Sequence, residues 1–278
     1  MRTRSGLWVW ATTMVVGMAA SGCGSNNDPV KGPQYAYPDV PTYCAARAKA
    51  ECSQVVLDNC QTTQDACVAA RRGACGQGVP AGASYRPAQA DACIAAVTAA
   101  YTNDTLTAAE LEAVDKACAQ LFQGTGVADS PCSSDTGCNL DAQLQCVMAT
   151  GSASGTCQIP VPVDPGGDCS AVDAVCQDGY FCSAEAQGCL QKYGTGKACS
   201  DVKPCQDTLR CVPTAATATD GTCEAKLDAM SACTCEAGKT WCQSSDCAGG
   251  LCSAVQGNLQ CASQLKLSPN EPICADFR

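Results

Sequence analysis

Between residues 43 and 124 the apolar positions recur at helical spacing. The clearest helix is predicted to begin at Thr107, because Thr107-Ala108-Ala109-Glu110 matches a capping box. The residues that then share one helical face are Leu111, Val114, Cys118, Leu121 and Phe122. Gly124 is predicted to end this helix. A preceding helix is predicted over residues 88–101, with Ile94, Val97 and Tyr101 on one stripe.

The spacing of the first cysteines predicts a helical hairpin at the start of this region. Cys44, Cys52, Cys60, Cys67 and Cys75 recur every seven or eight residues. Residues that face each other across two antiparallel helices have a nearly constant sum of residue numbers. That sum is 119 for Cys44 with Cys75 and for Cys52 with Cys67. We therefore expect the bridges Cys44–Cys75 and Cys52–Cys67. Of the remaining Cys60, Cys93 and Cys118, one must pair outside the module.

After residue 130 the pattern changes, and glycine, proline, serine and aspartate separate short runs between cysteines. Three segments, starting at Cys132, Cys169 and Cys199, each contain four cysteines. Each has a bulky apolar residue two positions before its third cysteine and a glycine shortly before its fourth. An altered fourth unit starts at Cys233 and holds seven cysteines. Each unit is predicted to form a short β-hairpin with irregular loops and two bridges.

The fold class predicted from these patterns is a small disulfide-rich modular protein, with an N-terminal α-helical module stapled by disulfides and β-hairpin or irregular cysteine-rich repeats after it. Large apolar residues are scarce, so we expect modules in a row without a large shared core. The predicted ranges are 1–22 (signal peptide), 23–42 (lipidated N-terminus and tether), 43–124 (helical module), 130–160, 167–191 and 197–224 (repeats), and 231–278 (atypical fourth module).

Residues 1–22 have the composition of an export signal, with a basic start, an apolar stretch from Leu7 to Ala20 and a small-residue end. Ala20-Ser21-Gly22-Cys23 resembles the bacterial lipobox, which implies acylation of Cys23 and anchoring in a membrane. Gly24 follows in place of the aspartate that retains enteric lipoproteins at the inner membrane, so the outer membrane is expected. Ala20 departs from the leucine usual at that position. The alternatives are a plain cleavage site that releases a secreted protein, and a retained membrane anchor.

The repeats resemble the cysteine-rich module of the N-terminal region of Dickkopf proteins, which is similar to colipase-like folds. The likeness rests on the C-x5–6-C-x5–7-C-x6–11-C spacing and on the ending Gly-Thr-Cys at Cys157 and Cys223. Together with the helical region and the lipobox, these repeats are similar to cysteine-rich lipoproteins of myxobacterial-type bacteria. That family implies no activity, and no receptor-contacting residue of the animal proteins can be matched.

The amino-acid composition restricts the kinds of catalysis and ligand binding that are open to this chain. The chain has 27 cysteines and no histidine, and this removes the usual general base and the commonest nitrogen ligand of metals. The net charge of −10 argues against nucleic-acid binding. The sequence C-x-x-C does not occur, which argues against zinc sites and thioredoxin-like redox chemistry, although a metal-thiolate cluster between Cys233 and Cys252 stays open. We expect no metal, no cofactor and no catalytic residues.

The leading functional hypothesis is a non-enzymatic envelope lipoprotein that presents its stapled modules as a structural or binding surface. Its partners would be the membrane, through the lipid on Cys23, and an extracellular or envelope protein. The alternative is a soluble inhibitor or toxin-like effector that acts through a loop between cysteines. The longest such loops are 147–156 and 212–222, and they lack aromatic or basic anchors. A carboxylate-based enzyme is the third possibility.

Overall fold

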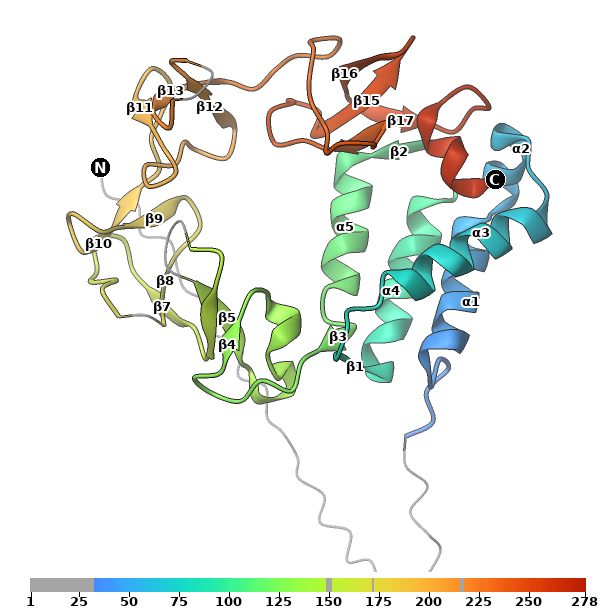
Figure 1. Cartoon of the computed structure of the whole chain (residues 1–278), viewed down its shortest axis with the longest axis horizontal. Coiled ribbons are helices and arrows are strands. Elements are labelled where there is room, and N and C mark those ends of the chain that lie inside the picture. Colours follow the sequence, from blue (N-terminus) through green and yellow to red (C-terminus); the bar gives the residue numbers. More distant parts are fainter. Residues whose placement is uncertain (1–32, 149–151, 172, 216–217) are drawn as a thin grey trace, which may run out of the picture. The chain divides into compact units, whose positions relative to one another are not determined.

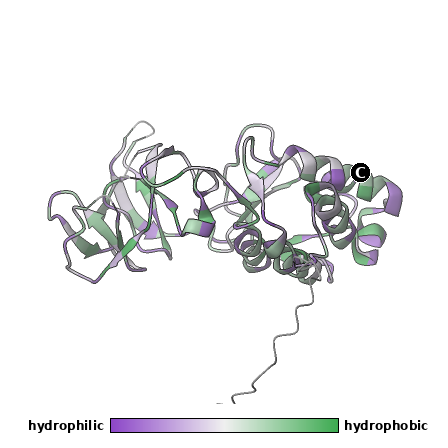
Figure 2. Cartoon of the chain, turned by 90° about the horizontal axis from the view of Figure 1, so that it is seen from below, coloured by the Kyte–Doolittle hydropathy of each residue, from purple (hydrophilic) through white to green (hydrophobic). Residues whose placement is uncertain are grey.

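The computed structural model describes residues 33–148, 152–171, 173–215 and 218–278 (Figure 1). The predicted signal peptide (1–22), Cys23 and residues 24–32 of the predicted tether lie outside these ranges. Residues 35–278 form one compact unit. In Figure 2, apolar and polar residues alternate over short distances along both the helices and the strands.

Helices form the N-terminal part of the described chain, and side-chain caps define where most of them begin. Asp39, Ser53 and Thr63 each accept a hydrogen bond from the backbone N–H three residues later. Thr107 and Glu110 form the predicted capping box. The helices are α1 Val40–Glu51, α2 Gln54–Cys60, α3 Gln64–Gln77, α4 Pro87–Ala100 and α5 Ala108–Cys118.

The helical hairpin is formed by α1 and α3, with α2 between them. Both bridges that the residue numbers predict, Cys44–Cys75 and Cys52–Cys67, are present. A third bridge, Cys93–Cys118, joins α4 to α5. The module is therefore a set of short helices held together by disulfides.

The predicted end of α5 at Gly124 is wrong, because the helix ends at Cys118. Phe122 and Gln123 form strand β3 (Phe122–Gln123), which pairs with β1 (Ser84–Tyr85). The apolar side chains of Leu121 and Phe122 fit the helical pattern, but the backbone after Cys118 bonds to the segment before α4 instead. The N–H of Arg86, for example, donates to the carbonyl of Leu121.

The strands form small, separate sheets. The two-stranded pairs outside the repeats are β1–β3 and β2–β17. Within the repeats the sheets are β4-β6-β5, β7–β8, β10–β9, β11-β13-β12 and β14-β15-β16. The strands are β2 Thr105–Thr107, β4 Pro131–Cys132, β5 Gln145–Met148, β6 Gly155–Gln158, β7 Val161–Val163, β8 Ala174–Cys176, β9 Tyr180–Ser183, β10 Gly188–Gln191, β11 Ala198–Cys199, β12 Leu209–Pro213, β13 Gly221–Ala225, β14 Trp241–Gln243, β15 Leu251–Val255, β16 Asn258–Ala262 and β17 Gln264–Lys266.

The three regular repeats have the same disulfide pattern. In each, the first cysteine pairs with the third and the second with the fourth. The third and fourth cysteines lie opposite each other in the hairpins β5–β6, β9–β10 and β12–β13. The bridges are Cys132–Cys146 and Cys138–Cys157, Cys169–Cys182 and Cys176–Cys189, and Cys199–Cys211 and Cys205–Cys223. The predicted hairpin with two bridges is confirmed.

Each repeat also has a leading segment that the spacing of cysteines did not indicate. In the three regular repeats a residue six positions before the first cysteine pairs in parallel with the second cysteine: Gly126 with Cys138, Val163 with Cys176 and Tyr193 with Cys205. In the last unit Leu227, six positions before Cys233, pairs in the same way with Cys247. The repeats thus begin four residues before the predicted starts at 130, 167, 197 and 231. The linkers between them are correspondingly short.

A turn at the same position in every unit closes this leading segment onto the hairpin. The residue three positions before the first cysteine has a left-handed backbone, with φ of 65°, 77°, 76° and 72° at Asp129, Gly166, Gly196 and Met230. Its N–H donates to the carbonyl of the fourth cysteine in the three regular repeats and to the carbonyl of Cys261 in the last unit. Two units use glycine at this position, which adopts positive φ without strain.

These shared bonds identify the atypical fourth module as a fourth copy of the repeat with additions. Cys233–Cys252 and Cys247–Cys261 reproduce the pattern of first with third and second with fourth. Cys235–Cys242 is an extra bridge inside the long loop between the first two of these cysteines. The seventh cysteine, Cys274, leaves the unit and pairs with Cys60.

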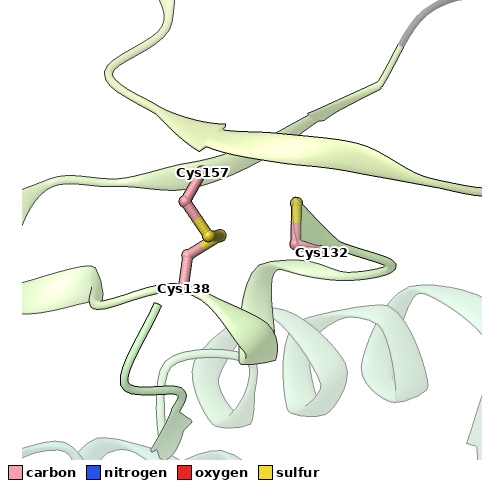
Figure 3. A group of neighbouring side chains, drawn as sticks. All are labelled: Cys132, Cys138 and Cys157. Atoms are coloured by element: carbon pink, nitrogen blue, oxygen red, sulfur yellow. A yellow bond between two sulfur atoms is a disulfide. The ribbon is translucent and has the colours of Figure 1, made fainter. Parts of the chain in front are cut away.

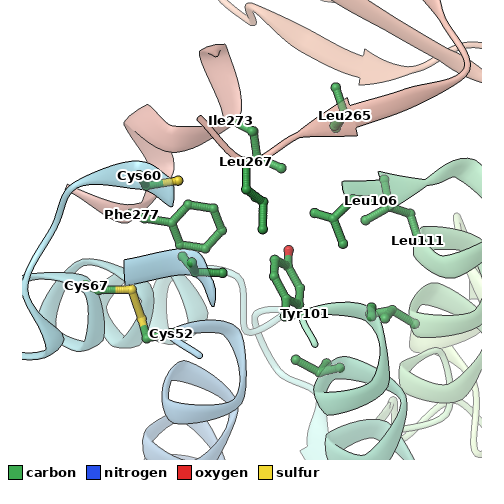
Figure 4. Close-up of a cluster of buried hydrophobic side chains, with 14 of the residues drawn as sticks. Cys52, Cys60, Cys67, Tyr101, Leu106, Leu111, Leu265, Leu267, Ile273 and Phe277 are labelled. Atoms are coloured by element: carbon green, nitrogen blue, oxygen red, sulfur yellow. A yellow bond between two sulfur atoms is a disulfide. The ribbon is translucent and has the colours of Figure 1, made fainter. Parts of the chain in front are cut away.

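The expectation of modules without a shared core, and with 231–278 as one module, is wrong at the C-terminus. Strand β17 pairs with β2 of the helical module, and the 3-10 helix η3 (Pro272–Phe277) lies against α3. Figure 4 shows side chains from both segments in one cluster. The C-terminal residues buried there are Leu265, Leu267, Ile273, Cys274 and Phe277. The small alanine-rich helices leave apolar surface that these larger side chains cover.

Substitution Gly155→Ala is expected to destabilise the hairpin of the first repeat by about 1–3 kcal/mol. A Cβ atom at Gly155 would overlap the carbonyl of Val147 on the paired strand. Hydrogen exchange of the β5–β6 amides measures this local stability. Gly73→Ala is the matched control, because a Cβ there meets nothing within 4 Å. Unchanged exchange in Gly155→Ala would show that the hairpin is not packed as described.

Candidate functional site

The site residues predicted from the sequence fall into two groups. Cys23 lies outside the described residues, whereas the two predicted staples, Cys44–Cys75 and Cys52–Cys67, lie in the helical hairpin. The candidate contact loops 147–156 and 212–222 connect the strands of two hairpins, and residues 149–151 and 216–217 of these loops lie outside the described ranges.

Each repeat gathers three cysteine sulfurs into a small cluster, as a thiolate metal site would. Figure 3 shows this for Cys132, Cys138 and Cys157, whose Sγ atoms all lie within 4.8 Å of one another. The same three positions cluster in the other units. In the structure every one of these sulfurs is bonded to another in a disulfide, and a metal needs thiolate ligands. In this oxidised state the clusters therefore serve as the repeats' miniature cores.

A buried group of charges lies where the helical hairpin meets the C-terminal segment. Glu51, the last residue of α1, is only 2% exposed. One of its carboxylate oxygens accepts from Nε of Arg47 at 2.9 Å, and the other accepts from Nε of Arg71 at 2.6 Å. The guanidinium of Arg71 also lies over the ring of Phe277, 5.2 Å from its centre. This group thus connects α1, α3 and η3.

Burial and the Glu51 carboxylate shift the pKa values of the two arginines and of Tyr101. Burial alone lowers the pKa of the Arg47 and Arg71 guanidinium groups, but the Glu51 carboxylate outweighs it and the pKa of each is raised. Burial also raises the pKa of the neighbouring Tyr101 hydroxyl above its ordinary value. At neutral pH the two arginines are charged, and Tyr101 is a neutral hydrogen-bond donor.

A cleft of about 930 Å³ opens beside this group. One wall comes from the helices and includes Arg47, Glu51, Arg71 and Tyr101. The other wall comes from residues 234–246 of the fourth repeat and from Ile273, Asp276 and Phe277. The volume is at the upper end of the range for sites that bind small molecules.

Two hydrogen bonds hold the wall formed by the fourth repeat. Nε1 of Trp241 donates to the carboxylate of Asp276 at 3.1 Å, and Nε2 of Gln243 donates to Asp115 on α5 at 3.2 Å. The Cys60–Cys274 bridge and the β2–β17 pair also attach the C-terminal segment to the helical module. These contacts hold the two walls of the cleft together. The cleft is therefore built into the closed framework of the chain.

Little in the amino-acid sequence indicated this site. Arg47 and Glu51 are four residues apart on a helix, which is ordinarily the pattern of an exposed ion pair. Arg71 comes from another helix, and Tyr101 was predicted only as part of an apolar stripe. Trp241, the single tryptophan after residue 22, was the one available signal. What brings these residues together is the return of the C-terminal segment.

Comparison with models of protein families, with curated proteins and with solved structures finds no match to this chain. No helix within the described residues has the length and apolar character needed to cross a bilayer.

Proposed function

We propose that this protein is a non-enzymatic lipoprotein of the cell envelope that presents a rigid, disulfide-closed binding surface outside the inner membrane. The observation that carries the proposal is that all 26 cysteines from Cys44 to Cys274 form 13 bridges. Such bridges form and persist in oxidising compartments, which agrees with the export signal. The cleft beside Glu51 supplies a surface for a ligand.

Lipid attachment to Cys23 is tested by intact-mass analysis of protein purified from membranes. We expect the mass of acyl chains on a chain that starts at Cys23, and a gain of 26 hydrogens on reduction, two for each bridge. The matched variant is Cys23→Ala, which should move the protein from the membrane fraction to the soluble fraction. Wild-type protein recovered without acyl groups from the medium would contradict anchoring and would support the secreted alternative.

A further inference from the structure

The cleft between the helical hairpin and the fourth repeat contains hydrogen-bond donors that the fold leaves free. Arg71 uses Nε for Glu51, and neither of its Nη groups donates to another residue in the described ranges. Arg47 uses Nε and Nη1, for Glu51 and Tyr43. The remaining guanidinium edges are held in place, because Glu51 fixes both groups and Phe277 covers a face of Arg71. Such pre-oriented planar donors match an oxyanion.

Tyr101 adds a donor of another kind. Its side chain is only 7% exposed and lines the cleft, yet within the described chain its hydroxyl makes no hydrogen bond. Figure 4 shows this hydroxyl directed toward Leu106 and Leu267, beside the C-terminal segment. The hydroxyl oxygen is not among the fully buried side-chain atoms that lack a hydrogen-bond partner, so solvent or a ligand can reach it. A ligand oxygen in the cleft would supply that partner.

The charges around the cleft restrict which anion fits. The lining residues include three basic side chains (Arg47, Arg71 and Lys239) and five acidic ones (Glu51, Asp115, Glu236, Asp246 and Asp276). Except for Glu51, these acids are exposed, whereas the two arginines are partly buried. A multiply charged phosphate would be repelled by the exposed acids. A ligand with a single carboxylate and an otherwise neutral or basic remainder suits both the partly buried arginines and the exposed acids.

We infer that this cleft binds a short peptide through its free C-terminal carboxylate, which the Nη groups of Arg71 and Arg47 and the hydroxyl of Tyr101 receive. The exposed acids then face the peptide's preceding residues and favour a basic side chain there. A volume of about 930 Å³ accommodates several residues rather than a single amino acid. The inference specifies the ligand of the proposed binding surface, and it rests on that part of the proposed function.

Calorimetric titration of the full-length protein in detergent micelles tests this site. The probes are acetyl-Lys-Ala-Ala with a free carboxylate, the same peptide as its carboxamide, and inorganic phosphate. We expect the free acid to bind at least about tenfold more tightly than the amide, since a charged acceptor strengthens each hydrogen bond. Phosphate should bind more weakly than the free acid. No binding of the free acid, equal binding of acid and amide, or tighter binding of phosphate would overturn the inference.

Variants assign the binding to these residues. Arg71→Gln should weaken binding of the free acid about tenfold, and the matched variant Arg72→Gln, on an exposed neighbour outside the cleft, should leave it unchanged. Because Arg71 also pairs with Glu51, Tyr101→Phe serves as a second variant that removes only the hydroxyl, with an expected loss of about fivefold. Unchanged affinity in Arg71→Gln and Tyr101→Phe would place the ligand elsewhere. None of these outcomes depends on acylation of Cys23, so the anchoring proposal is tested separately.

Discussion

Removal of the Cys60–Cys274 bridge, by the double substitution Cys60→Ala and Cys274→Ala, is expected to lower the free energy of unfolding of the helical module by about 5 kcal/mol. The bridge joins residues 214 positions apart. The other bridges shorten this loop, but the remaining path still exceeds roughly 100 residues, for which the chain-entropy estimate gives a value of this size. Without the bridge, the side chains of Ile273 and Phe277 are free to leave the core.

This loss is measured by denaturant unfolding under non-reducing conditions, followed by circular dichroism of the α-helices. The control is the double substitution Cys235→Ala and Cys242→Ala, because that bridge spans only seven residues inside the fourth repeat. It should leave the helical transition nearly unchanged. If the transition midpoint of the Cys60–Cys274 variant matched that of the wild type, the C-terminal segment would not be part of the helical core.

Glu51→Gln is the second substitution with a large expected effect. It removes the carboxylate that pairs with both Arg47 and Arg71 and leaves two guanidinium groups facing each other. Loss of one partner of a buried ion pair ordinarily costs 3–5 kcal/mol. We expect about 3 kcal/mol, at the lower end, because the side chains of Arg47 and Arg71 are 29% and 19% exposed and water screens them.

Glu112→Gln, an exposed residue of α5, is the matched control, because it removes the same charge from the surface. Its unfolding free energy should stay within about 0.5 kcal/mol of the wild type. The comparison uses the same helical dichroism at neutral pH. A loss below about 1 kcal/mol in Glu51→Gln, similar to that of a surface ion pair, would show that the charge group is solvated rather than buried.

Short sequence patterns predicted the elements that form through interactions between residues close in the sequence. The capping box at Thr107 needs only four consecutive residues, and the structure contains it. The bridges Cys44–Cys75 and Cys52–Cys67 followed from the geometry of two antiparallel helices, which fixes which residues can face each other. The repeat spacing predicted hairpins because each unit closes on itself with two bridges.

Other features depend on backbone bonds that side-chain patterns do not encode. The left-handed turn before the first cysteine of each repeat is occupied by Asp129 in one unit and Met230 in another, so no residue type marks it. The leading strand pairs through backbone groups alone, at Gly126, Tyr193 and Leu227 among others. Seven cysteines in the last module indicated that one must leave it, but only the structure shows that Cys274 reaches Cys60.

The cleft was the least predictable part, because its residues come from segments that lie far apart in the sequence. Arg71 reaches Glu51 only because the hairpin places α3 beside α1. Trp241 and Phe277 reach them only because the C-terminal segment returns to the helices. A site of this kind depends on the long-range bridge and so on the closure of the whole framework.

The structure makes this return of the chain covalent, through the Cys60–Cys274 bridge. Mass mapping of peptides from the unreduced protein, digested at low pH to prevent exchange, tests it most directly. The structure predicts a linked pair of peptides that contain Cys60 and Cys274, together with Cys233–Cys252 and Cys247–Cys261 inside the fourth repeat. A peptide in which Cys274 is a free thiol, or is linked to a cysteine between Cys233 and Cys261, would show that the C-terminal segment is not covalently joined to the helical module.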